Sequence, residues 1–194
     1  MKRPRRPFIL QRRRVFFGCE GDSERGYGGL IGRLLEEQRH DIHLDVALLK
    51  PGGGDPLALV ERAIRHIRES ERKRETPYAH RFLLLDSDTL GQNLNRDVQI
   101  NPLAQGAGLR LIWQEPCHEA LLLRHLEGCT ALRPQTANQA LAQLRQRWPD
   151  YVKGMPAVRL EAKIGHTEIG RVITVEPALA EFLAAIGYAT QQGQ

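Results

Sequence analysis

The chain has 194 residues, of which 41% are hydrophobic and 26% are charged, and its formal net charge is +5. This composition is typical of a globular protein and excludes an intrinsically disordered one. No apolar run approaches the roughly 18 residues that a membrane-spanning helix needs. The three cysteines have no metal-ligand spacing and, being odd in number, do not indicate a disulfide framework. We therefore expect one cytoplasmic globular unit without membrane association.

The chain begins with a basic arm. Residues 1–13 contain basic side chains and no acid, and Arg14 follows directly. Such arms neutralise phosphates and release counterions, so Arg12, Arg13 and Arg14 are predicted to contact nucleic acid. A solvated chain end explains the same residues, because termini are often disordered.

Strand-like and helix-like segments alternate along most of the chain. Short apolar runs at 15–19, 43–49, 82–85 and 108–113 predict strands, and residues 24–39 and 57–74 have helical periodicity. The polar segment 89–105 is interpreted as a loop or a helix. Further helices are predicted at 118–126 and 136–148, with one or two more between 160 and 188.

This alternation predicts an α/β fold with a Rossmann-like parallel sheet of about four strands flanked by helices. A helical C-terminal extension is expected to follow the sheet. We divide the chain into the arm (1–13), the α/β core (14–115) and an extension (116–194) that packs on the core as part of a single globular unit.

Acidic residues follow two of the predicted strands. Glu20 comes after the first, and Asp86 and Asp88 come after the third in chain order. Ligands of parallel sheets gather at the carboxyl ends of the strands, so these carboxylates are expected to converge. Like charges held together repel unless a cation lies between them, and oxygen ligands select a hard cation such as Mg²⁺, Mn²⁺ or Ca²⁺.

The two acidic stretches, Glu20-Gly21-Asp22-Ser23-Glu24 and Asp86-Ser87-Asp88, resemble the toprim (topoisomerase–primase) signature. A third stretch, Pro-Cys-His-Glu-Ala-Leu-Leu-Leu-Arg-His at 116–125, resembles a segment of RloB-like proteins, which include predicted toprim nucleases found near bacterial defence genes. It departs from that segment at His118, Leu121 and Arg124, where the family has Phe, Trp and Leu. Tyr-x-Lys at 151–153 also resembles the RloB-like pattern, and the resemblance spans roughly residues 14–153.

The resemblance implies a toprim-type endonuclease that depends on Mg²⁺ or Mn²⁺ and cleaves tRNA or DNA in bacterial antiviral defence. The chain has no ATPase motif, so a separately encoded ATPase is the implied partner. The implied roles fall on matching positions: metal ligation by Asp86 and Asp88, ligation or proton transfer by Glu20, secondary catalytic roles for Glu24 and Glu119, a supporting role for His125, and phosphate contact by Lys153.

Other interpretations of these residues stay open. Glu24 and Glu119 also suit the first turn of a helix, where the dipole favours a carboxylate, and Lys153 also suits an ordinary surface position. Lys50, Gly52 and Gly53 lie in a glycine-rich turn that lacks the P-loop ending and are secondary candidates for substrate contact. As whole-protein alternatives we consider a non-catalytic nucleic-acid-binding or ion-binding module and a phosphotransfer receiver. A receiver would need an acidic pair after the first strand and a later lysine after a strand.

Overall fold

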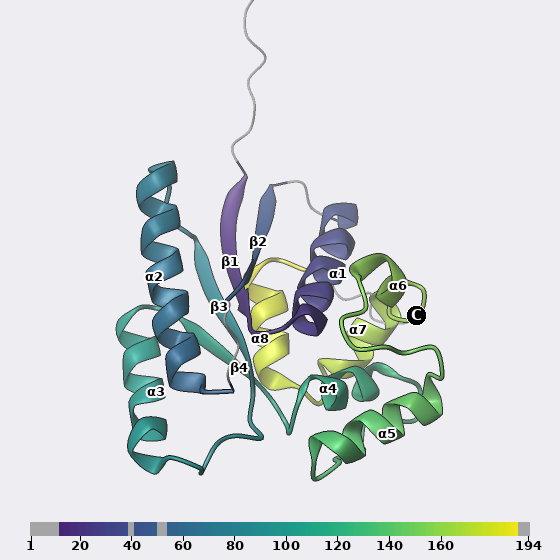
Figure 1. Cartoon of the computed structure of the whole chain (residues 1–194). Coiled ribbons are helices and arrows are strands. Elements are labelled where there is room, and N and C mark those ends of the chain that lie inside the picture. The colour runs from purple at the N-terminus through teal and green to yellow at the C-terminus, as the bar shows by residue number, and fades with distance from the viewer. Residues whose placement is uncertain (1–11, 39–40, 50–53, 190–194) are drawn as a thin grey trace, which may run out of the picture.

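The protein is described by a computed structural model that covers residues 12–38, 41–49 and 54–189 (Figure 1). Most of the basic arm, and the candidate contacts Lys50, Gly52 and Gly53, lie outside these residues. Four parallel strands form one sheet in the order β2-β1-β3-β4. The predicted α/β class, with its four-stranded parallel sheet and helical C-terminal region, is confirmed. The strands are β1 (Arg13–Cys19), β2 (Ile42–Leu48), β3 (His80–Asp86) and β4 (Arg110–Gln114).

Eight helices occur in the described part of the chain. They are α1 (Asp22–Gln38), α2 (Pro56–Arg74), α3 (Leu94–Gly106), α4 (His118–His125), α5 (Ala137–Arg147), α6 (Ala157–Glu161), α7 (His166–Val172) and α8 (Pro177–Ala185). Within the same residues, no helix combines the length and the apolar character that crossing a membrane requires.

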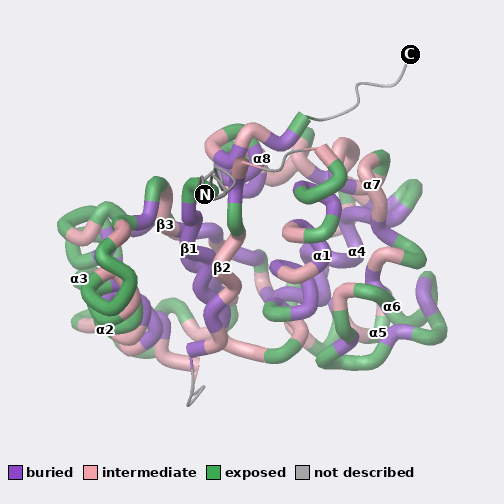
Figure 2. The backbone as a smooth tube through the Cα atoms, turned by 90° about the horizontal axis from the view of Figure 1, so that it is seen from above, coloured by how far each residue is buried: buried purple, intermediate pink, exposed green. Residues whose placement is uncertain are grey.

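The central strands β1 and β3 are buried on both faces of the sheet. Because successive side chains of a strand point to opposite faces, Phe17 and Leu84 join one hydrophobic cluster, while Phe16 and Leu83 join another on the far side. Figure 2 shows these strands as a buried centre between exposed helical surfaces. The near-continuous apolar runs in the sequence reflect this two-sided burial.

Helices cover the two faces differently. The helices α2 and α3 pack on one face, and α1 and α8 lie on the other (Figure 1). The ring of Phe182 in α8 lies 5.1 Å from the ring of Phe17 and 4.9 Å from that of Phe82. The extension from residue 116 onward therefore shares one hydrophobic core with the sheet.

The connections place a topological switch point between β1 and β3. The chain leaves β1 through α1 toward β2 at one edge, and it leaves β3 through α3 toward β4 at the other edge. These two helices cover opposite faces of the sheet (Figure 1). In open α/β sheets, the crevice at the carboxyl ends of such strands is the usual ligand site. Glu20 and Asp86 lie at these two ends.

Element bounds differ from the predictions mainly where apolar periodicity is weak. The polar segment 89–105 contains α3, which buries only Ile100 and Ala104. The C-terminal tail holds α7 and α8 as expected, and it is preceded by the one-turn α6, which contacts α1.

Candidate functional site

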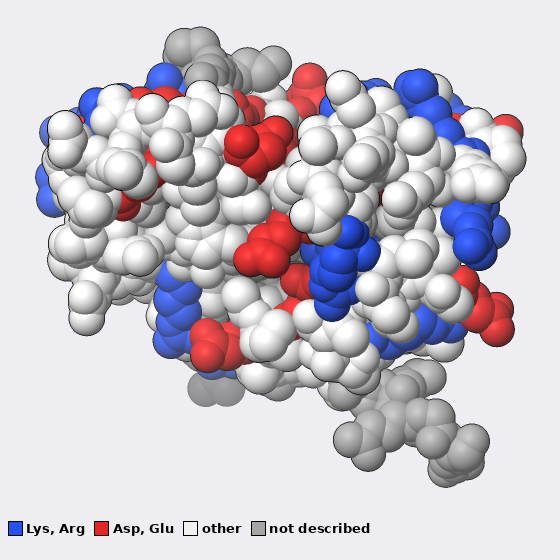
Figure 3. Space-filling view, turned by 90° about the horizontal axis from the view of Figure 1, so that it is seen from below, with Lys and Arg blue, Asp and Glu red and all other residues white. Residues whose placement is uncertain are grey.

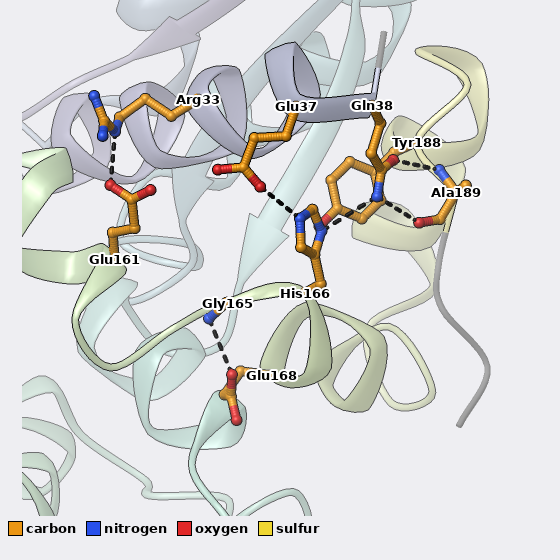
Figure 4. Close-up of polar contacts among 9 residues, drawn as sticks. All are labelled: Arg33, Glu37, Gln38, Glu161, Gly165, His166, Glu168, Tyr188 and Ala189. Carbon is orange, nitrogen blue, oxygen red and sulfur yellow. Dashed lines mark hydrogen bonds and ion pairs between the residues drawn. The ribbon is translucent and has the colours of Figure 1, made fainter. Parts of the chain in front are cut away.

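A cavity of about 360 Å³ opens at the carboxyl ends of β1 and β3. Figure 3 views the molecule from this side and shows acidic side chains gathered in the middle of the face, directly beside a basic one. All five carboxylates that the motifs single out line the cavity, together with a histidine and a lysine. The charged and histidine lining residues are Glu20, Asp22, Glu24, Asp86, Asp88, His118, Glu119 and Lys153.

The turn after β1 presents two of these carboxylates. The Oε1 atom of Glu20 accepts a hydrogen bond from the backbone N–H of Gly54, at 2.8 Å. Glu24 lies in the first turn of α1, and its carboxylate folds back over Gly21, where an added Cβ would lie 2.7 Å from Oε2. A side chain larger than hydrogen at position 21 would push the Glu24 carboxylate out of this position.

The Asp86-Ser87-Asp88 turn is fixed by backbone hydrogen bonds to the start of the extension. The N–H groups of Ser87 and Asp88 both donate to the carbonyl of Pro116, at 3.0 and 3.1 Å. The N–H of Ser87 also lies 3.0 Å from the carbonyl of Gln114. The acidic turn and the segment leading into α4 are therefore built as one unit.

Asp86 has a strongly raised pKa. Burial, followed by the negative charges of Glu24, Asp88, Glu119 and Glu20, raises its pKa from 3.8 to about 8. Its Oδ1 atom is buried and has no hydrogen-bond partner among the described residues. Carboxylates from two strand ends and two helices thus lie close enough to oppose ionisation of Asp86. A bound cation would offset the repulsion between these carboxylates.

Glu119 is held differently from Asp86. Its Oε1 atom lies 3.1 Å from Nζ of Lys153 and accepts a hydrogen bond from the hydroxyl of Tyr151 at 3.4 Å. Burial acts to raise the pKa of Glu119, but the hydrogen bond and charge of Lys153 outweigh it and leave this pKa below its usual value. The Lys153 side chain is 58% exposed and can reach a ligand at the cavity mouth.

His118 is a site residue that the sequence alone noted only as a departure from the RloB-like segment. It begins α4, is 1% exposed and lines the acidic cavity. The amide of Gln114 donates to Nδ1 at 2.6 Å, which places the proton of the neutral imidazole on Nε2. That Nε2 atom has no partner among the described residues. Burial lowers the pKa of His118 and favours this neutral form. The residue thus offers a buried N–H donor to a ligand.

The loop that carries Lys153 is attached to α1. The N–H of Gly154 donates to Oγ of Ser23 at 2.8 Å. Gly26 approaches the same loop so closely that an added Cβ would lie 2.2 Å from the carbonyl oxygen of Met155. Because α1 also carries Glu24, this attachment fixes the basic and acidic walls of the cavity relative to one another.

Not every predicted site residue lies in the cavity. Arg12, Arg13 and Arg14 lie at the opposite end of β1, about 20 Å away along a strand that rises about 3.3 Å per residue. Arg12 and Arg13 pair with Glu36 and Asp41. The geometry separates these arginines from the acidic residues, and contact of the arm with nucleic acid stays a prediction.

Arg14 belongs to a buried network rather than to the arm. Its guanidinium lies 3.1 Å from Asp45, 4.0 Å from the centre of the Tyr78 ring and 2.7 Å from the hydroxyl of Ser70. The Arg14 side chain is only 7% exposed, so it is not placed to meet a phosphate in this conformation.

His125 does not line the cavity. Its ring is fully buried, donates from Nδ1 to the carbonyl of Leu121 at 2.9 Å and accepts the hydroxyl of Tyr27 at Nε2, at 3.0 Å. Burial lowers the pKa of His125 to about 3. The residue joins α4 to α1, and any support that it gives the site is indirect.

The donor chemistry of the cavity suits a hard divalent cation, because the converging atoms are carboxylate oxygens and one of them is buried without a partner. The residues placed to hold such an ion are Glu20, Asp86 and Asp88. In the described ranges, however, no three His, Cys, Asp or Glu side chains are already arranged as a metal site.

Comparison of the chain with protein-family models, with curated proteins and with solved structures found no match. The toprim and RloB-like resemblance stays a prediction from the motifs, and the functional argument depends on the geometry of the cavity.

Proposed function

We propose that the protein is a metal-dependent nuclease that hydrolyses phosphodiester bonds with Mg²⁺ or Mn²⁺. The observation that carries the proposal is the environment of Asp86, a half-buried residue whose Oδ1 atom is buried without a hydrogen-bond partner among the described residues and whose pKa the charges of four other carboxylates help to raise. A cation at this point offsets the mutual repulsion of the carboxylates, and their oxygens are the ligands that Mg²⁺ and Mn²⁺ prefer.

The residues of the chain divide the work of hydrolysis. Asp86, Asp88 and Glu20 would hold the ion, which would supply charge neutralisation at the scissile phosphate and a water of lowered pKa. Glu20 or Glu24 accepts the proton of that water. On the other wall of the cavity, the exposed ammonium of Lys153 meets a phosphate oxygen.

The buried part of the cavity supplies two further groups. The Nε2–H of His118 donates to an oxygen that enters the cavity. Glu119 keeps Lys153 in place until a phosphate competes for its charge.

A cleavage assay tests this function. The purified chain is incubated with end-labelled tRNA, single-stranded DNA and duplex DNA in Mg²⁺, in Mn²⁺ and in chelator. We expect metal-dependent cleavage of one substrate class and at least about a hundredfold loss in Asp86→Asn and Glu20→Gln, since each removes charge on which the ion depends. Glu69→Gln, an exposed acid on α2 outside the cavity, is the matched control. Cleavage that persists in chelator or in Asp86→Asn contradicts the proposal.

A non-catalytic module that binds an ion or nucleic acid is the second candidate. The acidic cavity and the exposed Lys153 at its mouth suit it as well, because binding an ion or a phosphate does not require an attacking water. This candidate predicts that Mg²⁺ raises the melting temperature while every substrate stays intact, including in the presence of a neighbouring ATPase. A role in bacterial defence, with that ATPase as partner, stays a prediction from the resemblance.

A further inference from the structure

A second cavity, of about 410 Å³, lies beside the loop that joins α5 to α6. Its lining combines apolar and basic side chains. The apolar members are Trp148, Pro149, Met155, Val158 and Ala162, and the basic members are Arg147, Arg159 and Lys163. We refer to it as the basic cavity.

The basic cavity is next to the acidic one. Lys153 lines the acidic cavity and Met155 lines the basic cavity, and two residues span at most about 7 Å of chain. The loop between them is held on α1 by the hydrogen bond from Gly154 to Ser23. A polymer whose phosphate occupies the acidic cavity therefore has a fixed neighbouring site within reach.

The charge of the basic cavity is mostly unbalanced. Arg147, Arg159 and Lys163 are exposed, and Asp150 is the only acid among its described lining residues. Figure 3 shows basic side chains spread over this side of the face, toward the region of α5 and α6, with some acidic side chains among them, and a separate group of acidic side chains in the middle. The distribution favours a polyanion that passes from one cavity to the other.

The apolar lining of the basic cavity indicates which polyanion it suits. Val158 is 63% exposed, whereas Trp148 and Met155, which also line the cavity, are only 7% and 2% exposed. Exposed apolar surface bordered by cations matches the two halves of a nucleotide, since the flat face of a base packs on apolar or aromatic surface while its phosphate pairs with Arg or Lys. Bases stacked inside a duplex do not present these faces.

We propose that the basic cavity binds an unpaired nucleotide of the strand whose neighbouring phosphate occupies the acidic cavity. The proposal rests on the proposed function for its substrate class and deepens it, because it selects single-stranded RNA or DNA over duplex. Arg159 and Lys163 contact the sugar–phosphate backbone, and Val158 contacts the base beside the lining residue Trp148.

Binding without cleavage tests this site separately from catalysis. Fluorescence anisotropy is measured for the full chain in chelator, with short labelled single-stranded RNA, single-stranded DNA of the same sequence and the corresponding duplex, over a range of salt concentrations. Arg159→Gln/Lys163→Gln should weaken single-strand binding about tenfold and reduce the slope of log affinity against log salt by about 1.4, since each phosphate contact on a single strand contributes roughly 0.7.

The control removes the same charge elsewhere. Arg65→Gln/Arg68→Gln lies on the exposed side of α2, which covers the opposite face of the sheet, and should leave binding unchanged. In a Trp113→Phe background, the remaining tryptophan, Trp148, should change its fluorescence when the single strand binds. The RNA and DNA arms identify which backbone binds more tightly.

Several results would overturn the site: equal weakening in both double variants, duplex binding as tight as single-strand binding, equal binding of polyglutamate, or no response from Trp148. Failure of the proposed function looks different. In that case the wild type still binds single strands and Arg159→Gln/Lys163→Gln still binds them more weakly, but no cleavage occurs with Mg²⁺ or Mn²⁺.

Discussion

Replacing Asp86 by asparagine should stabilise the metal-free protein at alkaline pH. The pKa of Asp86 is about 8 in the folded state, against a reference value of 3.8. Below about pH 4 Asp86 is protonated in both states and does not change the free energy of unfolding. Between about pH 4 and pH 8 it lowers the free energy of unfolding by more with each pH unit, and above about pH 8 by a constant amount. Asparagine has nearly the same shape and no charge to bury, so it removes this cost.

The size of the effect follows from about 1.36 kcal/mol for each unit of pKa difference. The cost at Asp86 is about 2 kcal/mol at pH 5 and at most about 5 kcal/mol at pH 8. In chelator, the free energy of unfolding of Asp86→Asn should therefore exceed that of the wild type by an amount that grows by up to about 3 kcal/mol between these two pH values.

Urea denaturation at a series of pH values, in chelator and followed by circular dichroism, measures this difference. Asp150→Asn provides the control, because it changes the same functional groups at an exposed position. A difference that does not change with pH, or an Asp86→Asn protein less stable than the wild type at pH 8, would refute the electrostatic account of the cavity. The proposed metal site would then lose its main support.

Three further predictions concern the walls of the cavity. In thermal melts, Mg²⁺ should raise the melting temperature of the wild type more than that of Asp88→Asn, because the ion binds the folded state alone; equal shifts would remove Asp88 from the ligands. Lys153→Met should lower the free energy of unfolding at pH 7 by about 1 kcal/mol, a value kept small by the exposure of the lysine. This loss should become smaller as the pH falls, because Glu119 is then protonated in both the folded and the unfolded state. A loss that is unchanged at pH 3 would argue against the ion pair between Lys153 and Glu119. Gly26→Ala should lower the free energy of unfolding by about 2 kcal/mol because the added Cβ meets a backbone carbonyl. Gly32→Ala, where the added Cβ has nothing within 4 Å, should be neutral or stabilising. Equal urea midpoints for these two variants would contradict the close approach of α1 to the loop that carries Met155.

The sheet and the acidic cavity follow largely from the sequence. Apolar runs that are buried on both sides identify β1 and β3 because a parallel sheet covered by helices leaves them no polar face. Convergence of Glu20 and Asp86 follows from the rule that ligands meet at the carboxyl ends of parallel strands. Glu119 and Lys153 entered through the family resemblance, and their contact across the cavity depends on how the extension folds back, which no local pattern encodes.

Other features could not be predicted from local patterns. The charge of Arg14 is typical of a basic arm, but Asp45 and Tyr78, both distant in sequence, enclose it. The helix α3 has few buried positions, so its periodicity is weak. His118 differs from the residue at the matching place in the RloB-like segment, and only its burial beside the carboxylates marks it as a ligand-facing donor.

The carbonyl of Pro116 accepts the backbone N–H groups of both Ser87 and Asp88. A break in the chain at this point, as in a circular permutant or a protein split into two fragments, would release the acidic turn as well as the start of α4. New termini are better tolerated in the loop between α3 and β4, which leaves this shared acceptor intact. Reassembly of fragments divided on either side of Pro116 would thus be a sensitive reporter of whether the acidic turn has formed.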